Sequence, residues 1–205
     1  MDVLSVAEVE RLLAHCNQRT FLGARMYALI ALMYDSGLRV GEIIGLTVDD
    51  IDWKQYHVLV KGKGKKQRLV PFSLTTHKAL RKYLIRRNEF LADVDCDTFF
   101  ISKAGNRMTQ GALSHVIKRF GVRAGVPRLH PHLLRHSMAT QFLMNDGNPS
   151  ALRRIMGHTS SATTEGYINF VAQHLAEQHQ RFSPMSKVNA NLYGVQRNPT
   201  RRRRQ

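Results

Sequence analysis

Residues 51–72 read IDWKQYHVLV, KGKGKK and QRLVPF in turn, and this stretch decides the fold class. The first and last parts, residues 51–60 and 67–72, are together rich in Val, Ile, Leu, Tyr and Trp, which favours β-strands. The glycines and lysines between them are typical of a hairpin turn that projects charge into solvent. We therefore expect two antiparallel strands here, joined by a basic turn.

Helical patterns lie on both sides of this hairpin. A capping box at Ser5 and Glu8 starts the first, which runs to about residue 16, and Ser36-Gly37 breaks the second, which begins at residue 21. Further helices are expected at residues 40–46, 74–87, 109–123, 133–145, 148–156 and 172–181, and residues 99–101 are a short strand or an apolar loop. The sequence thus predicts a mainly α fold with a small antiparallel β-sheet, an α+β domain.

The charge of the chain indicates the class of its partner. Its 205 residues include 31 Lys and Arg against 15 Asp and Glu, a net charge of +16, which attracts polyanions and above all nucleic acid. A non-catalytic ribosomal or chromatin-like binder has the same electrostatics. A membrane partner is not expected, because no basic amphipathic stretch stands apart from the folded pattern, and the sequence has neither a transmembrane-length apolar run nor a signal peptide. The isolated Cys16 and Cys96 favour a reduced cytosolic setting and argue against structural zinc.

The segment HLLRH, residues 132–136, has the composition of an anion site. His132 and Arg135 lie at i and i+3, on one face of a helix that Pro131 can begin, and a helix start favours an anion. A capping histidine beside a surface arginine explains the pair equally simply. Metal binding by His132 and His136 is a further alternative, although HExxH has a glutamate that is missing here.

Two more cations stand at turns earlier in the chain. Arg39 follows a Gly-Leu turn, and Glu42 at i+3 would either form an ordinary salt bridge with it or hold its guanidinium for a phosphate. Lys63 lies at the glycine-flanked tip of the hairpin. It is either a solvated charge or an ammonium that folds over a bound backbone, and the neighbouring Lys61, Lys65 and Lys66 leave open which lysine would do so.

The stretch GHTSSATTEGY, residues 157–167, completes the set of candidates. His158 follows a glycine at the end of a helix, where a histidine is often a cap. Tyr167 would by itself be read as a core tyrosine. The order and spacing of all these elements in so basic a chain are improbable by chance.

Taken together, these motifs resemble the catalytic domain of the tyrosine recombinases, the phage integrase family. That family shows Arg in a Gly-Leu-Arg-x-x-Glu context, Lys on a β-hairpin, His-x-x-Arg-His, Gly-His, and Tyr nine residues after that last His. The resemblance extends from about Leu4 to Phe182, and it implies six catalytic positions with two supporting residues. The catalytic positions are Arg39, Lys63, His132, Arg135, His158 and Tyr167, and the supporting residues are Glu42 and His136.

The resemblance implies a site-specific DNA recombinase that cleaves and rejoins DNA through a 3′-phosphotyrosine intermediate, without metal, cofactor or ATP. Double-stranded DNA and a tetramer of the protein on two DNA sites would be the partners, in the cytoplasm at the nucleoid. Lys61, Lys65, Lys66 and Arg68 are further DNA-binding candidates. A type IB topoisomerase-like nicking and closing enzyme and a non-catalytic DNA-binding protein are the alternatives.

The resemblance also divides the chain. Residues 1–185 would form the catalytic domain, and residues 186–205, which end in four arginines, would be a flexible basic tail. The helical core-binding domain that usually precedes the catalytic domain is expected to be absent from this chain. A second departure is His130, which stands before Pro-His where many relatives have Thr or Ser.

Overall fold

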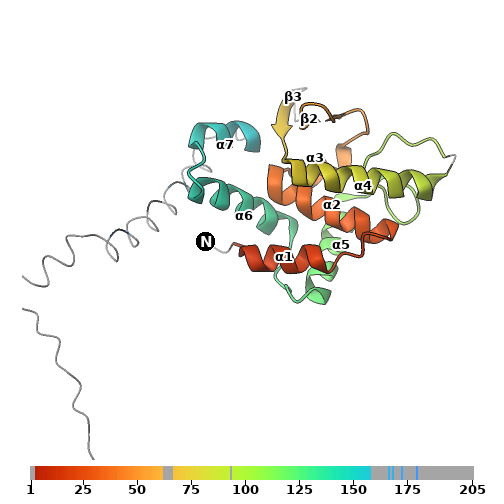
Figure 1. The fold of residues 1–205 in the computed structure, drawn as a ribbon, viewed down its shortest axis with the longest axis horizontal. Helices are drawn as coiled ribbons and strands as arrows, with labels where there is room; N and C mark the ends of the chain where they lie inside the picture. Colours follow the sequence, from red (N-terminus) through yellow and green to blue (C-terminus); the bar gives the residue numbers. More distant parts are fainter. Residues whose placement is uncertain are drawn as a thin grey trace, which may run out of the picture.

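A computed structural model describes residues 3–61, 67–92 and 94–157, and the single residues Gly166, Ile168, Ala172 and His179. The described part is mainly helical with one three-stranded antiparallel sheet, which confirms the α+β prediction (Figure 1). The helices are α1 (Val6–Ala14), α2 (Phe21–Ser36), α3 (Val40–Gly45), α4 (Leu74–Leu91), α5 (Gln110–Arg123), α6 (Pro131–Met144) and α7 (Pro149–Met156). The strands are β1 (Ile51–Asp52), β2 (His57–Lys61) and β3 (Gln67–Pro71), in that order across the sheet.

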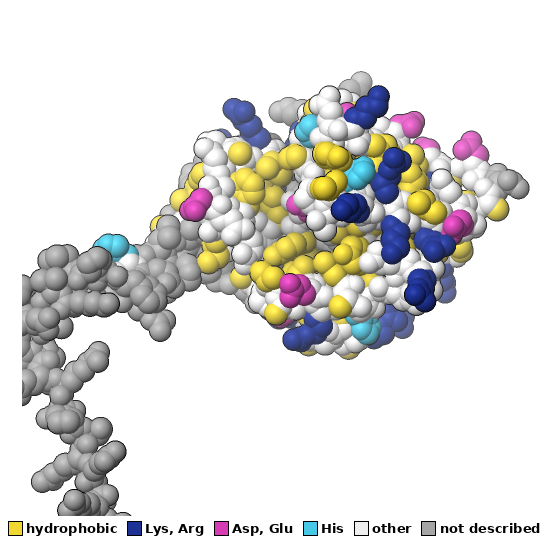
Figure 2. Space-filling view, in the orientation of Figure 1, with side chains coloured by type: hydrophobic (Ala, Val, Ile, Leu, Met, Phe, Trp, Pro, Cys, Tyr) yellow, Lys and Arg dark blue, Asp and Glu magenta, His cyan; other side chains and the backbone are white. Residues whose placement is uncertain are grey.

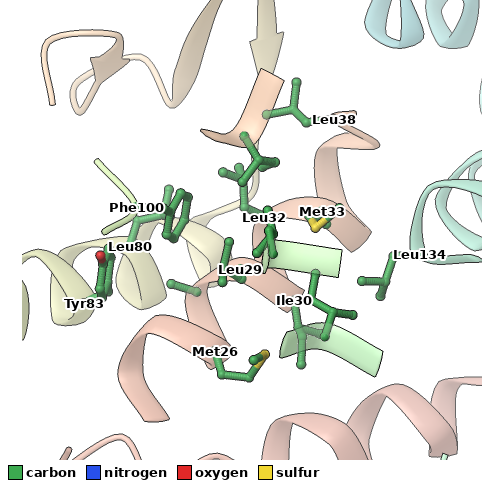
Figure 3. Packing of buried hydrophobic residues seen from close by; sticks show 14 of the residues in the cluster. Met26, Leu29, Ile30, Leu32, Met33, Leu38, Leu80, Tyr83, Phe100 and Leu134 are labelled. Atoms are coloured by element: carbon green, nitrogen blue, oxygen red, sulfur yellow. The ribbon is translucent and has the colours of Figure 1, made fainter. Parts of the chain in front are cut away.

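Helix α2 is the centre of the core. It is apolar around most of its circumference, as expected of a helix that is covered on several sides. It packs against α1, α4 and α6, so elements from both halves of the sequence meet on it (Figure 1). Figure 3 shows side chains of α2, among them Leu29 and Leu32, packed with Tyr83 of α4 and Phe100. This packing holds the ends of α2 and α6, where the candidate site lies.

The prediction of a single strand over residues 51–60 is wrong, because a turn divides this stretch into two strands. The Asp52 carboxylate accepts hydrogen bonds from the backbone amides of Lys54 and Gln55, both at 2.9 Å, and Tyr56 adopts a left-handed φ of 58°. An aspartate that binds the amides two and three residues ahead favours a turn over a continuous strand. β1 and β2 therefore form a hairpin of their own, with Ile51 paired to Val58.

The second hairpin agrees with the prediction. β2 and β3 pair antiparallel from His57 opposite Pro71 to Lys61 opposite Gln67. Residues 62–66, which include Lys63, Lys65 and Lys66, lie outside the described part of the chain. The register sets Val58 and Val60 on the buried face, and the same face of β3 carries Val70.

The ambiguous segment at residues 99–101 is a buried loop with bridge pairs at its ends. Thr98 pairs with Thr47 and Ile101 pairs with Arg107. The Tyr83 hydroxyl donates to the Phe99 carbonyl at 3.0 Å and accepts from the Ile101 amide at 3.2 Å. These bonds satisfy polar backbone groups that burial removes from water.

The remaining helices match their predicted places within a few residues, with α4 extending four residues further than expected, to Leu91. The helix expected at residues 172–181 and the tail at residues 186–205 fall outside the described residues, apart from Ala172 and His179. None of the helices in the described ranges is long and apolar enough to cross a membrane.

Candidate active site

Arg39 stands at the junction of α2 and α3. Helix α2 ends at Gly37, whose left-handed φ of 64° suits glycine, and Arg39 is the N-cap of α3. The Arg39 amide donates to Glu42 Oε2 at 2.8 Å, and its Nη1 lies 3.2 Å from Glu42 Oε1. The predicted pairing of these two residues is therefore present. The Arg39 side chain is 45% exposed, so its guanidinium is accessible to an anion.

Glu42 has a second and closer partner in Arg68. Arg68 Nη1 and Nη2 lie 2.8 and 3.0 Å from Glu42 Oε1 and Oε2, a two-pronged contact that suits a guanidinium and a carboxylate. The Glu42 side chain is only 10% exposed. Burial alone would raise its pKa, but hydrogen bonds from Arg68 and from the Arg39 amide outweigh burial and lower the pKa below its ordinary value. Glu42 is thus held as a carboxylate between two arginines.

Arg135 joins the first turns of α6 to the ends of two other helices. Its Nη1 donates to the Gly37 carbonyl, and its Nη2 donates to the Met156 carbonyl at 2.9 Å. The residue is buried, with 7% of its surface exposed. A Cβ atom on Gly37 would lie 2.8 Å from the sulfur of Met156, so glycine here also leaves room for a side chain of α7.

The C-terminal end of α7 is where the arginines meet. Three consecutive carbonyls each accept from a different guanidinium: Ile155 from Arg68 at 3.0 Å, Met156 from Arg135 at 2.9 Å, and Gly157 from Arg39 at 3.5 Å. A helix C-terminus carries partial negative charge and unpaired carbonyls, which favours cations there. The chain that leaves this helix continues directly into His158.

His130 supplies the cap of α6. Its Nδ1 accepts from the Leu133 amide at 3.2 Å, and Pro131 occupies the first helical turn. This is the bond that the hydroxyl of a serine or threonine makes at an N-cap. The departure from the family pattern noted at this position therefore keeps the helix start intact.

His132 and His136 lie on the same helix with different exposures. His132 is exposed on the first turn, whereas His136 is half-buried. Burial, followed by the positive charges of His132, Arg135 and His130, lowers the pKa of His136. His136 is therefore held neutral at pH values where an ordinary histidine begins to ionise. Among the described residues, no three His, Cys, Asp or Glu side chains are grouped in a way that could hold a metal ion.

The structure describes three of the six predicted catalytic positions. It brings Arg39 and Arg135 to adjacent peptide groups at the end of α7, and it places His132 one turn from Arg135 on α6. Lys63, His158 and Tyr167 lie outside the described residues, as do Lys65 and Lys66. Of the described DNA-binding candidates, Arg68 is bound to Glu42, and Lys61 Nζ lies 2.8 Å from Asp50 Oδ1.

Main-chain carbonyls organise these arginines, which the sequence does not indicate. The carbonyls of Gly37, Ile155 and Met156 carry no residue-type signal. Gly37 and Gly157 do provide one, since each glycine predicts the end of a helix and each caps its helix in the left-handed conformation. Figure 2 shows Lys and Arg side chains gathered over the α4 side of the face that it presents, as expected of a surface that attracts polyanions.

The mainly helical fold, the basic hairpin and the paired arginines define a protein of the tyrosine recombinase class, at the level of its catalytic domain. The chain belongs to the Phage integrase family, whose profile matches residues 2–174. Its curated relatives include the tyrosine recombinase XerC of Pseudomonas aeruginosa, 37% identical over 174 residues, which are 85% of this chain and 57% of the relative. This chain thus spans somewhat more than half the length of that relative.

Solved structures give the same assignment. The crystal structure of XerA recombinase has a TM-score of 0.77 and 33% identity, over 90% of this chain and 66% of that one. The XerH site-specific recombinase bound to a palindromic difH substrate, in a post-cleavage complex, has a TM-score of 0.72 and 28% identity, over 87% of this chain and 52% of that one.

Proposed function

We propose that this chain cleaves and rejoins double-stranded DNA at a specific site through a covalent 3′-phosphotyrosine bond to Tyr167. The observation that carries the proposal is the convergence of Arg39 and Arg135 on adjacent carbonyls at the end of α7, one residue before His158. Phosphoryl transfer depends chiefly on positioning and on neutralising the phosphate oxygens. Two arginines held this close can supply that positive charge.

In the cleavage step, the Tyr167 oxygen attacks the scissile phosphorus and the bond from phosphorus to the 5′-oxygen breaks. The tyrosine proton passes to His132, because a phenol with an ordinary pKa of about 10 needs a base near neutral pH. Lys63 gives a proton to the departing 5′-oxygen. His158 donates a hydrogen bond to a non-bridging oxygen, beside the arginines.

In the joining step, a 5′-hydroxyl attacks the phosphotyrosine and the tyrosine leaves. The number of phosphodiester bonds is restored, so the exchange needs no ATP. The roles of Glu42 and His136 are supporting: Glu42 holds Arg39, and His136 follows Arg135 on α6, one turn after His132. Lys61, Lys65 and Lys66 are proposed to bind the DNA backbone, where basic side chains give affinity without sequence readout.

The same proposal extends to the division of the chain, its assembly on DNA and its place in the cell. Residues 1–185 would be the catalytic domain and residues 186–205 a basic tail that holds phosphates loosely. The protein would act as a tetramer on two DNA sites, in the cytoplasm at the nucleoid. The XerH recombinase bound to its difH substrate supports a DNA partner.

The test is a search for a covalent adduct with DNA. The chain is incubated with duplexes that carry a randomised centre and a nick near it, so that cleavage releases a short fragment and traps the protein. Adducts that survive detergent and heat are isolated, and the attached DNA is sequenced. We expect an enriched sequence with wild-type protein and no adduct with Tyr167→Phe.

Tyr56→Phe is the matched control, since it removes one hydroxyl from an exposed tyrosine in the turn between β1 and β2, and its adduct should equal that of wild type. An adduct that persists in Tyr167→Phe, or a wild-type chain that forms none, contradicts the proposal. Relaxation of supercoiled plasmid without any enriched sequence would instead favour a type IB topoisomerase-like activity. Salt-dependent binding without an adduct would favour a DNA-binding protein.

A further inference from the structure

Arg68 occupies an unusual place for a residue expected to contact DNA. Its side chain on β3 is only 19% exposed. Two nitrogens bind both oxygens of Glu42, at 2.8 and 3.0 Å, and Nε donates to the Ile155 carbonyl at 3.0 Å. One side chain therefore connects the sheet, helix α3 and the end of helix α7.

The guanidinium also lies directly against Gly157. A Cβ atom built on Gly157 would lie 2.8 Å from Arg68 Cζ and 2.9 Å from its Nε, closer than real Cβ atoms approach other atoms. Gly157 has a φ of 61°, which is a second reason for glycine at this position. The lack of a side chain here leaves room for the Arg68 guanidinium against the end of α7, where it reaches the Ile155 carbonyl.

The Glu42 carboxylate makes closer contacts with Arg68 than with Arg39. Arg68 makes two close contacts with the carboxylate, whereas the Arg39 side chain makes one longer contact of 3.2 Å. The carboxylate carries one negative charge and its two partners carry two positive charges. Because Arg68 takes the larger part of the carboxylate, Arg39 keeps positive charge for another anion.

We propose that Arg68 is a positioning residue, which holds Glu42 and the end of α7 so that Arg39 keeps its positive charge for a phosphate. This role rests on the proposed function and deepens it. In the absence of Arg68, Glu42 would pair fully with Arg39 and withdraw it from the DNA, and α7 would lose a bond that fixes its end. Arg68 acts through its neighbours and needs no contact with the substrate.

The test compares cleavage with binding on the duplex enriched in the adduct experiment. At saturating DNA, Arg68→Gln should lower the single-turnover cleavage rate about 100-fold, the effect expected when a group near the chemistry is displaced. Its Kd for the duplex, measured in a Tyr167→Phe background, should change far less than the cleavage rate, because Arg39 is one phosphate contact among many. Arg68→Lys should not restore the rate, because a lysine cannot contact both carboxylate oxygens as a planar fork does.

Arg86→Gln is the matched control, since Arg86 Nη1 pairs with Glu89 Oε2 at 2.7 Å on the exposed side of α4. It should cleave at the wild-type rate. Arg68→Gln could instead bind the duplex more weakly and cleave at an unchanged rate, with the slope of log affinity against log salt concentration smaller by about one. That result would overturn the proposal and make Arg68 a phosphate contact. A wild-type rate in folded Arg68→Lys would also overturn it.

The pKa of Glu42 tests the role of Arg68 independently of DNA cleavage. If the wild-type chain forms no adduct, the proposed function fails, and the arrangement is then tested in the free protein by NMR titration of the Glu42 carboxyl carbon. The pKa of Glu42 should rise in Arg68→Gln and Arg68→Lys and stay unchanged in Arg86→Gln. An unchanged pKa in the Arg68 variants would overturn the proposed positioning of Glu42.

Discussion

Arg135 Nη2 donates to the Met156 carbonyl at 2.9 Å and so fixes the beginning of α6 to the end of α7. The other arm of the same guanidinium reaches the Gly37 carbonyl at the end of α2. A residue expected to bind phosphate is thus also a link between three helix ends. Because Arg135 has both roles, replacing it should lower both the stability of the fold and the rate of DNA cleavage.

The first prediction concerns the shape of this side chain. Arg135→Lys keeps the charge but cannot span both carbonyls, and it leaves buried polar groups unpaired. We expect the free energy of unfolding to fall by about 2 to 4 kcal/mol, because hydrogen bonds to charged groups and buried charges are involved. Urea unfolding measures the change.

Arg39→Lys is the comparison for that measurement. Arg39 is 45% exposed and makes weaker contacts, so its replacement should cost less than about 1 kcal/mol. Equal stability losses in the two variants would show that Arg135 does not link the helices as described.

The second prediction concerns the cap of α6. His130→Ala removes the acceptor for the Leu133 amide and should lower the free energy of unfolding by about 1 kcal/mol. His130→Ser keeps an acceptor at the N-cap and should retain most of the stability that the cap contributes. His132→Ala, at an exposed position two residues later, is the control and should leave stability unchanged. Thermal unfolding of the three variants decides this, and an unstable His130→Ser would show that His130 acts by other means than capping.

The third prediction concerns the loss of stability at low pH through protonation of Glu42. The pKa of Glu42 is lower in the folded chain than its ordinary value of 4.5, against the effect of burial, through hydrogen bonds from Arg68 and Arg39. The unfolded state therefore binds the proton more readily, so the contribution of Glu42 to stability is present above pH 4.5 and is lost as pH falls through the lowered pKa.

Glu42→Gln removes this contribution. Because other carboxyls also titrate, the informative quantity is the difference in unfolding free energy between wild type and variant. That difference should shrink as the pH is lowered from 6 to 3. A difference that stays constant over this range would mean that Glu42 is not held as described.

The fourth prediction concerns the two cysteines. Burial raises the pKa of Cys16 to about 12, and its sulfur donates to the Leu12 carbonyl at 3.4 Å. Since the thiolate is the reactive form, Cys16 should resist a thiol reagent in the folded chain, while half-buried Cys96 reacts first. The Cys96→Ser variant should thus react only after unfolding in denaturant. Rapid labelling of folded Cys96→Ser would contradict the packing around α1.

Local signals were enough to predict most of the fold. Capping residues such as Ser5, breaks such as Gly37, and apolar periodicity located the helices, and the basic glycine-rich turn located the β2–β3 hairpin. The division between β1 and β2 was missed, because Ile51 and Val58 read as one apolar run while the turn depends on the geometry of Asp52.

The site was predictable only in part. Arg39, His132 and Arg135 were identified because their spacing in the chain matches a family pattern. Their partners were not, since the carbonyls of Gly37 and Met156 belong to the backbone and lie far from Arg135 in sequence. The contact between Arg68 and Glu42 joins residues 26 positions apart, and no local pattern indicates such a pairing.

The most direct test of the central claim is to identify the residue that becomes attached to DNA. The adduct is digested with nuclease and trypsin and analysed by mass spectrometry. Cleavage after Arg154 and Arg181 releases residues 155–181, a peptide whose one tyrosine is Tyr167. We predict that this peptide carries a nucleotide through its 3′-phosphate on Tyr167, and a nucleotide found on any other peptide, or on none, would contradict the account.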